Sequence, residues 1–130
     1  MKRETEEWLK IALEEYKSAT VLLEKGLYRL VCYHSQQTLE KILKAILTEK
    51  EVEFSRTHNI LDLRNAAQRV GYKTELPDED SVFLNSIYRF RYPSDLGLIP
   101  TGEPTKEDAE KAIGIAQIMV DSIPTFKKVN

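Results

Sequence analysis

The segment Leu27–Ala45, LYRLVCYHSQQTLEKILKA, decides the fold class of this chain. When it is read as a helix at about 100° per residue, its apolar residues gather on one side. That side holds Leu27, Val31, Thr38, Ile42 and Ala45, and it is widened by Cys32, Leu39, Leu43 and Ile46. The segment is therefore predicted to be an amphipathic helix that packs against other helices.

A second, polar stripe runs along the same helix. It consists of His34, Gln37, Lys41 and Lys44, with Tyr33 and Glu40 beside it. Exposed helix faces usually carry Glu and Lys, so a stripe with His and Gln is unusual. We interpret it as a solvated face with an ion pair between Glu40 and Lys44, four residues apart. The alternative is a ligand site.

Helical patterns continue on both sides of this segment. A first helix is predicted from about Glu4 to Lys25, and Gly26 is placed to end it. Its apolar face holds Trp8, Ala12, Tyr16, Ala19 and Leu23. The second helix follows almost at once and reaches about Lys50, and so short a connection predicts an antiparallel hairpin.

The rest of the chain also carries helix boundaries rather than strand patterns. After a loop over 51–57, Asn59 resembles an N-cap for a short helix that ends near Gly71. Acidic residues 78–80 begin another helix, which carries Val82, Phe83, Ile87 and Phe90 and stops before Pro93. A loop over 93–104 precedes the last helix.

Thr105 and Asp108 form a capping box at the start of that helix. Its apolar positions are Ala109, Ala112, Ala116, Val120 and Ile123. No segment alternates as a strand would, so the predicted fold is an all-α, antiparallel four-to-five-helix up-and-down bundle, one domain over residues 1–130.

Composition excludes several classes of protein. The 130 residues are 42% hydrophobic and 31% charged, which is typical of a soluble globular chain. The net charge of −2 gives no overall attraction to nucleic acid, so any anion site must be local. No apolar run could span a membrane, and the charged start is unlike a signal peptide, so we expect a cytoplasmic protein.

One Cys and two His cannot form a usual zinc site, and Cys32 is expected to be a small buried hydrophobe.

Four elements, in this order, resemble the HEPN family, the nucleotide-binding domain of higher eukaryotes and prokaryotes. They are Trp8-Leu9 with LLEKG at 22–26, YHSQQTLEKILKA at 33–45, THNILDL at 57–63, and RYP at 91–93. The resemblance implies a helical bundle that forms homodimers and stands beside a separate minimal nucleotidyltransferase, in some cases as a toxin–antitoxin pair. Many members of the family are ribonucleases, and others serve as binding modules.

The ribonucleases of that family carry an Arg followed, after four to six residues, by a His. Arg29 and His34 match literally, but five positions on a helix set two side chains about 140° apart. The match also lies in the second helix, whereas the family's motif belongs to the later helices. There, Arg91 has no His after it. The usual catalytic pattern is therefore absent, and an atypical site that pairs Arg91 with His34 or His58 is the alternative.

The candidate ligand-binding residues are His34, Gln37, Lys41, Lys44, Arg56, His58, Arg91 and Tyr92. Arg91 could hold a phosphate while Tyr92 stacks on a base; alternatively, Arg91 pairs with Glu40. Arg56 and His58 could form a second anion contact, or His58 could cap or pack against the third helix. His34 is expected to be hydrogen-bonded and partly buried.

With the absent catalytic pattern, the resemblance implies a module that binds a nucleotide or RNA without catalysis, forms a homodimer and partners a minimal nucleotidyltransferase. No cofactor, metal or membrane is expected. Two alternatives stay open: a metal-independent ribonuclease toxin that uses Arg91 with His34 or His58, and a purely structural dimerisation domain.

Overall fold

The computed structural model describes residues 1–54, 57–87 and 103–129. Within these ranges the chain forms six helices and no strand, which confirms the predicted all-α class. The helices are α1 (Arg3–Glu24), α2 (Tyr28–Glu49), α3 (Ile60–Arg69), α4 (Asp78–Ile87), α5 (Lys106–Asp121) and α6 (Ile123–Val129).

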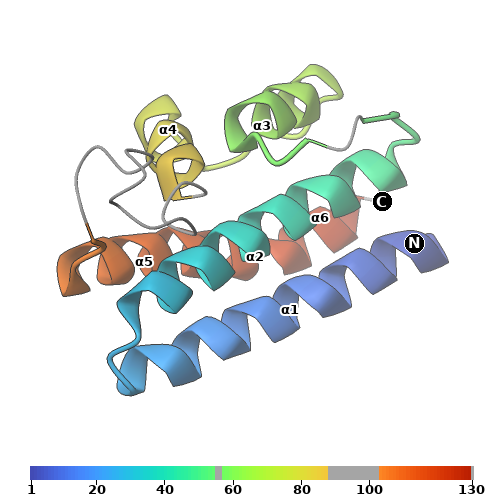
Figure 1. Ribbon diagram of the computed structural model, residues 1–130. Helices are drawn as coiled ribbons and strands as arrows, with labels where there is room; N and C mark the ends of the chain where they lie inside the picture. Colours follow the sequence, from blue (N-terminus) through green and yellow to red (C-terminus); the bar gives the residue numbers. More distant parts are fainter. Residues whose placement is uncertain (55–56, 88–102, 130) are drawn as a thin grey trace.

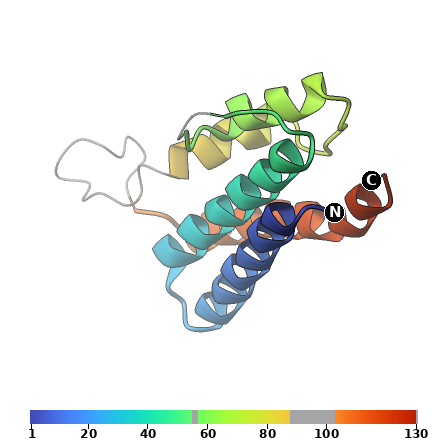
Figure 2. The same cartoon turned by 90° about the vertical axis from the view of Figure 1, so that its right-hand side faces the viewer.

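Helix α2 is the centre of the fold. Helices α1 and α2 run antiparallel side by side, and α5 packs along α2 as well (Figure 1). The shorter α3 and α4 lie on the side of α2 that faces away from α1 (Figure 2). Because neighbours surround α2, residues all round it are buried, including Gln37, Glu40 and Lys44. The interpretation of its polar stripe as a solvated face is therefore wrong.

The hairpin between α1 and α2 depends on Gly26, which adopts a positive φ of 71°. That conformation is easily reached only by glycine, and it ends α1 as predicted. Leu27 was predicted on the apolar face but is 47% exposed. It precedes α2 as its N-cap, with ψ at 70°, so it does not follow the helical phase of the residues after it.

Local capping defines α3 and α4. The Asn59 side chain accepts from the Asp62 backbone N–H at 3.1 Å, as an N-cap does. Asn85 of α4 donates to Asn59 Oδ1 at 3.0 Å and accepts from the Ile60 N–H at 2.7 Å, which joins the two helices. Val82 is 56% exposed rather than in the core, because α4 buries the face of Ser81, Leu84 and Ile87 instead.

The capping box of Thr105 and Asp108 is present at the start of α5. Three fully buried alanines, Ala109, Ala112 and Ala116, let α5 pack closely on the core. The predicted single last helix is broken after Asp121, and a separate α6 begins at Ile123. Pro124 explains the break, since it has no N–H to donate to Val120 and its ring crowds that carbonyl.

Cys32 is fully buried, as predicted. Burial, with a smaller contribution from Asp108, raises the pKa of its thiol to about 12. Among the described residues, no helix is both long and apolar enough to cross a bilayer.

Candidate anion-binding site

The polar residues of α2 converge on one carboxylate. Glu40 lies in the middle of α2 and its side chain is fully buried. Lys41 Nζ lies 2.9 Å from Glu40 Oε2, and Lys44 Nζ lies 3.8 Å from Oε1. His58, in the segment before α3, hydrogen bonds to Oε1 through Nδ1. Burying a carboxylate is costly unless it is paired, and these three groups provide its hydrogen-bond and ion-pair partners.

Two glutamines connect this carboxylate cluster to the backbone. Gln37 accepts from Lys41 Nζ at 2.8 Å and donates to Gln36 Oε1 at 2.8 Å. Gln36 in turn donates to the His58 carbonyl oxygen at 3.3 Å. The pair thus joins α2 to the segment that precedes α3. We refer to Gln36, Gln37, Glu40, Lys41, Lys44 and His58 as the Glu40 network.

The network opens to solvent at one end. The His58 side chain is 48% exposed and that of Lys41 is 18% exposed, whereas Lys44 is almost covered. Two ammonium groups face one carboxylate, so the network carries a positive surplus even when His58 is neutral. The Lys41 ammonium has three N–H donors, of which Gln37 and Glu40 take two. An anion that approaches this opening would meet a partly desolvated cation.

Lys44 occupies the covered end of the network. Its ammonium lies 5.7 Å from the centroid of Trp8 and 5.8 Å from that of Phe54, within range of a cation–π interaction. Burial lowers the pKa of Lys44, and the charge of Glu40 works against that shift. Lys44 therefore lies between Glu40 and an aromatic pair and reaches solvent poorly.

His34 belongs to a different contact. Its Nδ1 lies 2.9 Å from Glu15 Oε2 of α1, and its ring packs edge-on against Tyr33. Arg29 forms an ion pair with Glu103, ahead of α5. The two residues of the literal Arg29-x4-His34 match thus have separate partners on different elements.

Among the predicted site residues, the structure brings Gln37, Lys41, Lys44 and His58 together. Arg56, Arg91 and Tyr92 lie outside the described residues, and so does the alternative pairing of Arg91 with Glu40. In the described part of the chain, no group of three or more His, Cys, Asp or Glu residues could hold a metal ion.

Sequence reasoning missed two features of this region. Gln36 is fully buried, although nothing in the polar stripe singled it out. Arg64 of α3 is also buried, and it donates to the Leu76 carbonyl at 2.9 Å and pairs with Asp78. An arginine in a short helix gave no signal of that role, which is to attach α3 to the start of α4.

Known proteins resemble this chain over nearly all of its length. The family model described as the HEPN domain matches residues 5–125. A protein of Methanocaldococcus jannaschii named "Putative toxin MJ1304" is 32% identical over 135 residues, which cover 93% of this chain and 86% of that protein. The crystal structure of ST0689, described as an archaeal HEPN homologue, superposes with a TM-score of 0.66 at 25% identity, covering 96% of this chain and 98% of that one.

Proposed function

This chain belongs to the HEPN domain family, and on that premise we propose that it binds a phosphate-bearing ligand, a nucleotide or RNA, without cleaving it. The observation that carries the proposal is the partly exposed Lys41 ammonium at the solvent-facing end of the Glu40 network, which as a whole holds two lysines and one carboxylate. There, the Lys41 ammonium lies beside a fully buried carboxylate that also hydrogen bonds to His58. A phosphate oxygen could accept from the remaining Lys41 N–H.

The network is well suited to binding because its cations are held in place before a ligand arrives. Gln37 and Glu40 fix the Lys41 ammonium at 2.8 and 2.9 Å, so little side-chain entropy is lost when a phosphate binds. Arg56, two residues before His58, and Arg91 with Tyr92 are proposed to complete the site. His34, which hydrogen bonds to Glu15 of α1 and lies two turns before Lys41 on α2, is proposed to contribute as well.

The biological setting we propose is a toxin–antitoxin-like pair. The similarity to a protein named as a toxin supports this setting. In it, the chain forms a homodimer in the cytoplasm and partners a separate minimal nucleotidyltransferase. The test is to express the chain alone and together with such a nucleotidyltransferase; growth arrest that only co-expression relieves supports the pairing, and unaffected growth in both cases argues against it.

A second candidate function is metal-independent RNA cleavage, and one observation favours it. The buried Glu40 carboxylate engages His58 Nδ1, an arrangement that orients an imidazole for acid–base catalysis. In that case, His58 would take the proton of the ribose 2′-hydroxyl and Arg91 would stabilise the phosphate charge.

The experiment that tests the proposal measures RNA binding and cleavage in the same samples. Fluorescence anisotropy of a short fluorescein-labelled RNA of mixed sequence is followed without divalent metal, and gels report cleavage. Lys41→Gln is expected to weaken binding by about tenfold or more, because a charge-assisted hydrogen bond to phosphate is lost. Lys17→Gln, at an exposed lysine of α1, is the matched control and should bind as the wild type does.

Three outcomes are informative. Binding without cleavage, weakened by Lys41→Gln only, supports the binding module. Cleavage that His58→Ala abolishes while the fold is retained establishes the nuclease instead. Absence of binding by the wild type, or equal losses in the Lys17 and Lys41 variants, would overturn the proposed site.

A further inference from the structure

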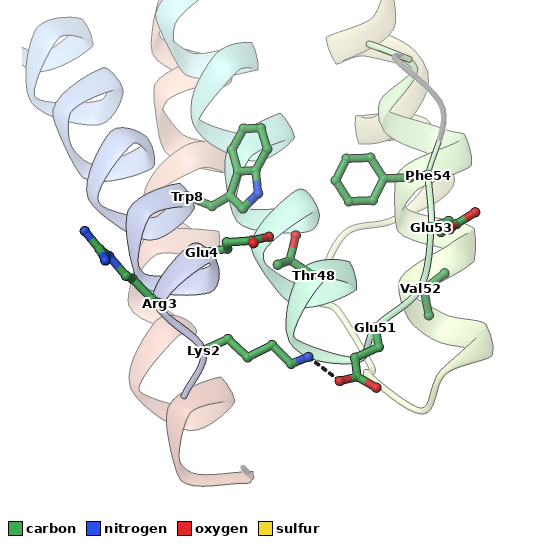
Figure 3. A pocket seen from close by; sticks show the side chains of 9 residues that line it. All are labelled: Lys2, Arg3, Glu4, Trp8, Thr48, Glu51, Val52, Glu53 and Phe54. Carbon is green, nitrogen blue, oxygen red and sulfur yellow. Dashed lines mark hydrogen bonds and ion pairs between the residues drawn. The ribbon is translucent and has the colours of Figure 1, made fainter.

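An open groove of about 810 Å³ lies where the start of α1, the end of α2 and the segment after α2 meet. Trp8 of α1 and Phe54 of that segment both line it (Figure 3) and contact each other edge to face, with their ring centroids 6.4 Å apart and their planes at 62°. Thr48 of α2 lies between them. Both rings are only partly buried, so the groove offers two aromatic surfaces to a ligand.

Charged side chains surround the two rings. Glu4 and Glu53 line the groove, and neither carboxylate forms a hydrogen bond or ion pair in the described ranges. Glu51 forms an ion pair with Lys2 on the opposite wall, and Arg3 lies beside Lys2. The groove therefore holds acceptors that are not yet used, close to aromatic faces.

The charge balance favours a neutral ligand at the rings. Three carboxylates and two basic side chains line the groove, and the Lys44 ammonium lies over both rings without lining it. A bare cation at the rings would be repelled by Lys44, and a bare anion would be repelled by Glu4 and Glu53. A flat, neutral ring that donates hydrogen bonds avoids both costs.

We propose that this groove holds a nucleobase with an exocyclic amino group, stacked on Trp8 or Phe54 and donating to Glu4, whose carboxylate points into the groove (Figure 3). Aromatic side chains bind bases by stacking, and carboxylates accept from base amino groups such as N4 of cytosine. Arg3 and Lys2, at the edge of the groove, lie where the sugar–phosphate backbone of the same ligand would leave it.

This inference deepens the proposed function, and it rests on that function for the identity of the ligand. Lys44 connects the two places, since its ammonium lies 3.8 Å from Glu40 and 5.7 Å from the Trp8 centroid. The phosphate opening at Lys41 and His58 and the aromatic groove thus lie on two sides of the same lysine. A single strand of RNA could place a phosphate at the first and a base at the second.

Trp8 is the only tryptophan in the chain, so tryptophan fluorescence reports on the surroundings of this one ring. The test titrates the protein with cytidine, adenosine, guanosine and uridine monophosphates. Saturable quenching by the three amino-bearing nucleotides, with uridine monophosphate at least several-fold weaker, is the expected result. Glu4→Gln should weaken the binding of these three nucleotides by a few-fold and reduce their advantage over uridine monophosphate, whereas Glu110→Gln, at an exposed position of α5, should change neither.

Phe54→Leu provides a second variant that removes stacking and keeps an apolar side chain. It should weaken the binding of all four nucleotides, and a thermal melt reports whether the fold is retained. Linear quenching that never saturates, equal for all four nucleotides and unaffected by Glu4→Gln, would overturn the inference. Saturable binding of spermidine that excludes the nucleotides would overturn it too, in favour of a cation site.

The outcomes separate this inference from the proposed function. If labelled RNA binds in a Lys41-dependent manner and Trp8 fluorescence does not change, the proposed function stands and the base site is rejected. Base-selective quenching that Glu4→Gln reduces, together with an RNA affinity that Lys41→Gln does not change, supports the base site and rejects the phosphate site.

Discussion

The imidazole of His58 hydrogen bonds through Nδ1 to the fully buried carboxylate of Glu40, 18 residues earlier in the chain. This bond attaches the segment before α3 to the middle of the central helix. It also gives the buried carboxylate a partner that reaches solvent. The relationship explains why a charged residue can lie at the centre of a helical bundle, and it makes Glu40 the residue on which the local structure depends.

Glu40→Gln is expected to lower the free energy of unfolding by on the order of 3 kcal/mol. The substitution leaves the Lys41 and Lys44 ammonium groups partly buried without their counter-ion. Urea denaturation followed by circular dichroism measures the loss. Glu110→Gln on the surface of α5 is the control and should change stability by less than about 0.5 kcal/mol; a similar small effect at Glu40 would contradict the prediction.

Arg64→Leu is expected to destabilise the protein by about 1–3 kcal/mol, while Asp78→Asn should cost much less. Arg64 is buried, and its loss leaves the Leu76 carbonyl without that donor. Asp78 is 78% exposed, so water replaces its ion pair at little cost. Thermal melts of the two variants measure the difference. Equal decreases in melting temperature would show that the ion pair, rather than the buried hydrogen bonds, holds α3 to α4.

Cys32 should not react with a thiol reagent such as Ellman's in the native protein up to about pH 9, and should react fully in denaturant. Burial raises the pKa of the folded thiol from 9.0 to about 12 and also blocks access. Since the unfolded thiol ionises first, the stabilising contribution of Cys32 is complete below pH 9.0 and is lost as the pH rises towards 12. A Cys32→Ala variant should not show this part of the loss of stability at alkaline pH.

Glu49 should contribute to stability at neutral pH and lose that contribution in acid. The backbone N–H of Lys2 donates to its carboxylate at 2.9 Å and the buried Thr5 hydroxyl donates at 2.8 Å, and together they lower the pKa of Glu49 below 4.5. A lowered folded pKa means stability that is present above the unfolded pKa and disappears as the pH falls through the folded one.

The measurement for Glu49 is the difference in unfolding free energy between the wild type and Glu49→Gln at several pH values. We expect the difference to be largest at neutral pH and to shrink below pH 4.5. Glu110→Gln, whose carboxylate is exposed on α5, should show no such trend. A difference that stays constant down to pH 3 would mean that Glu49 acts through packing rather than through its charge.

The amino-acid sequence by itself determined the helices and their ends. The residues that mark helix ends act within a few positions of themselves, so local chemistry suffices to predict those ends. They are Gly26, Asn59, Thr105 and the acidic start of α4. The break at Ser122 was equally local, because Pro124 removes one backbone donor, and it could have been read from the chain.

Only the tertiary structure decided what the polar residues of α2 do. A helical wheel shows which side chains share a face, but not how many neighbours surround the helix, and here α1, α3, α4 and α5 all contact α2. For that reason, the sequence did not predict the burial of Gln37, Glu40 and Lys44. Nor did it predict the hydrogen bond between Glu40 and His58 or the contact between Trp8 and Phe54. These contacts join residues far apart in the chain, and no periodicity in the sequence encodes them.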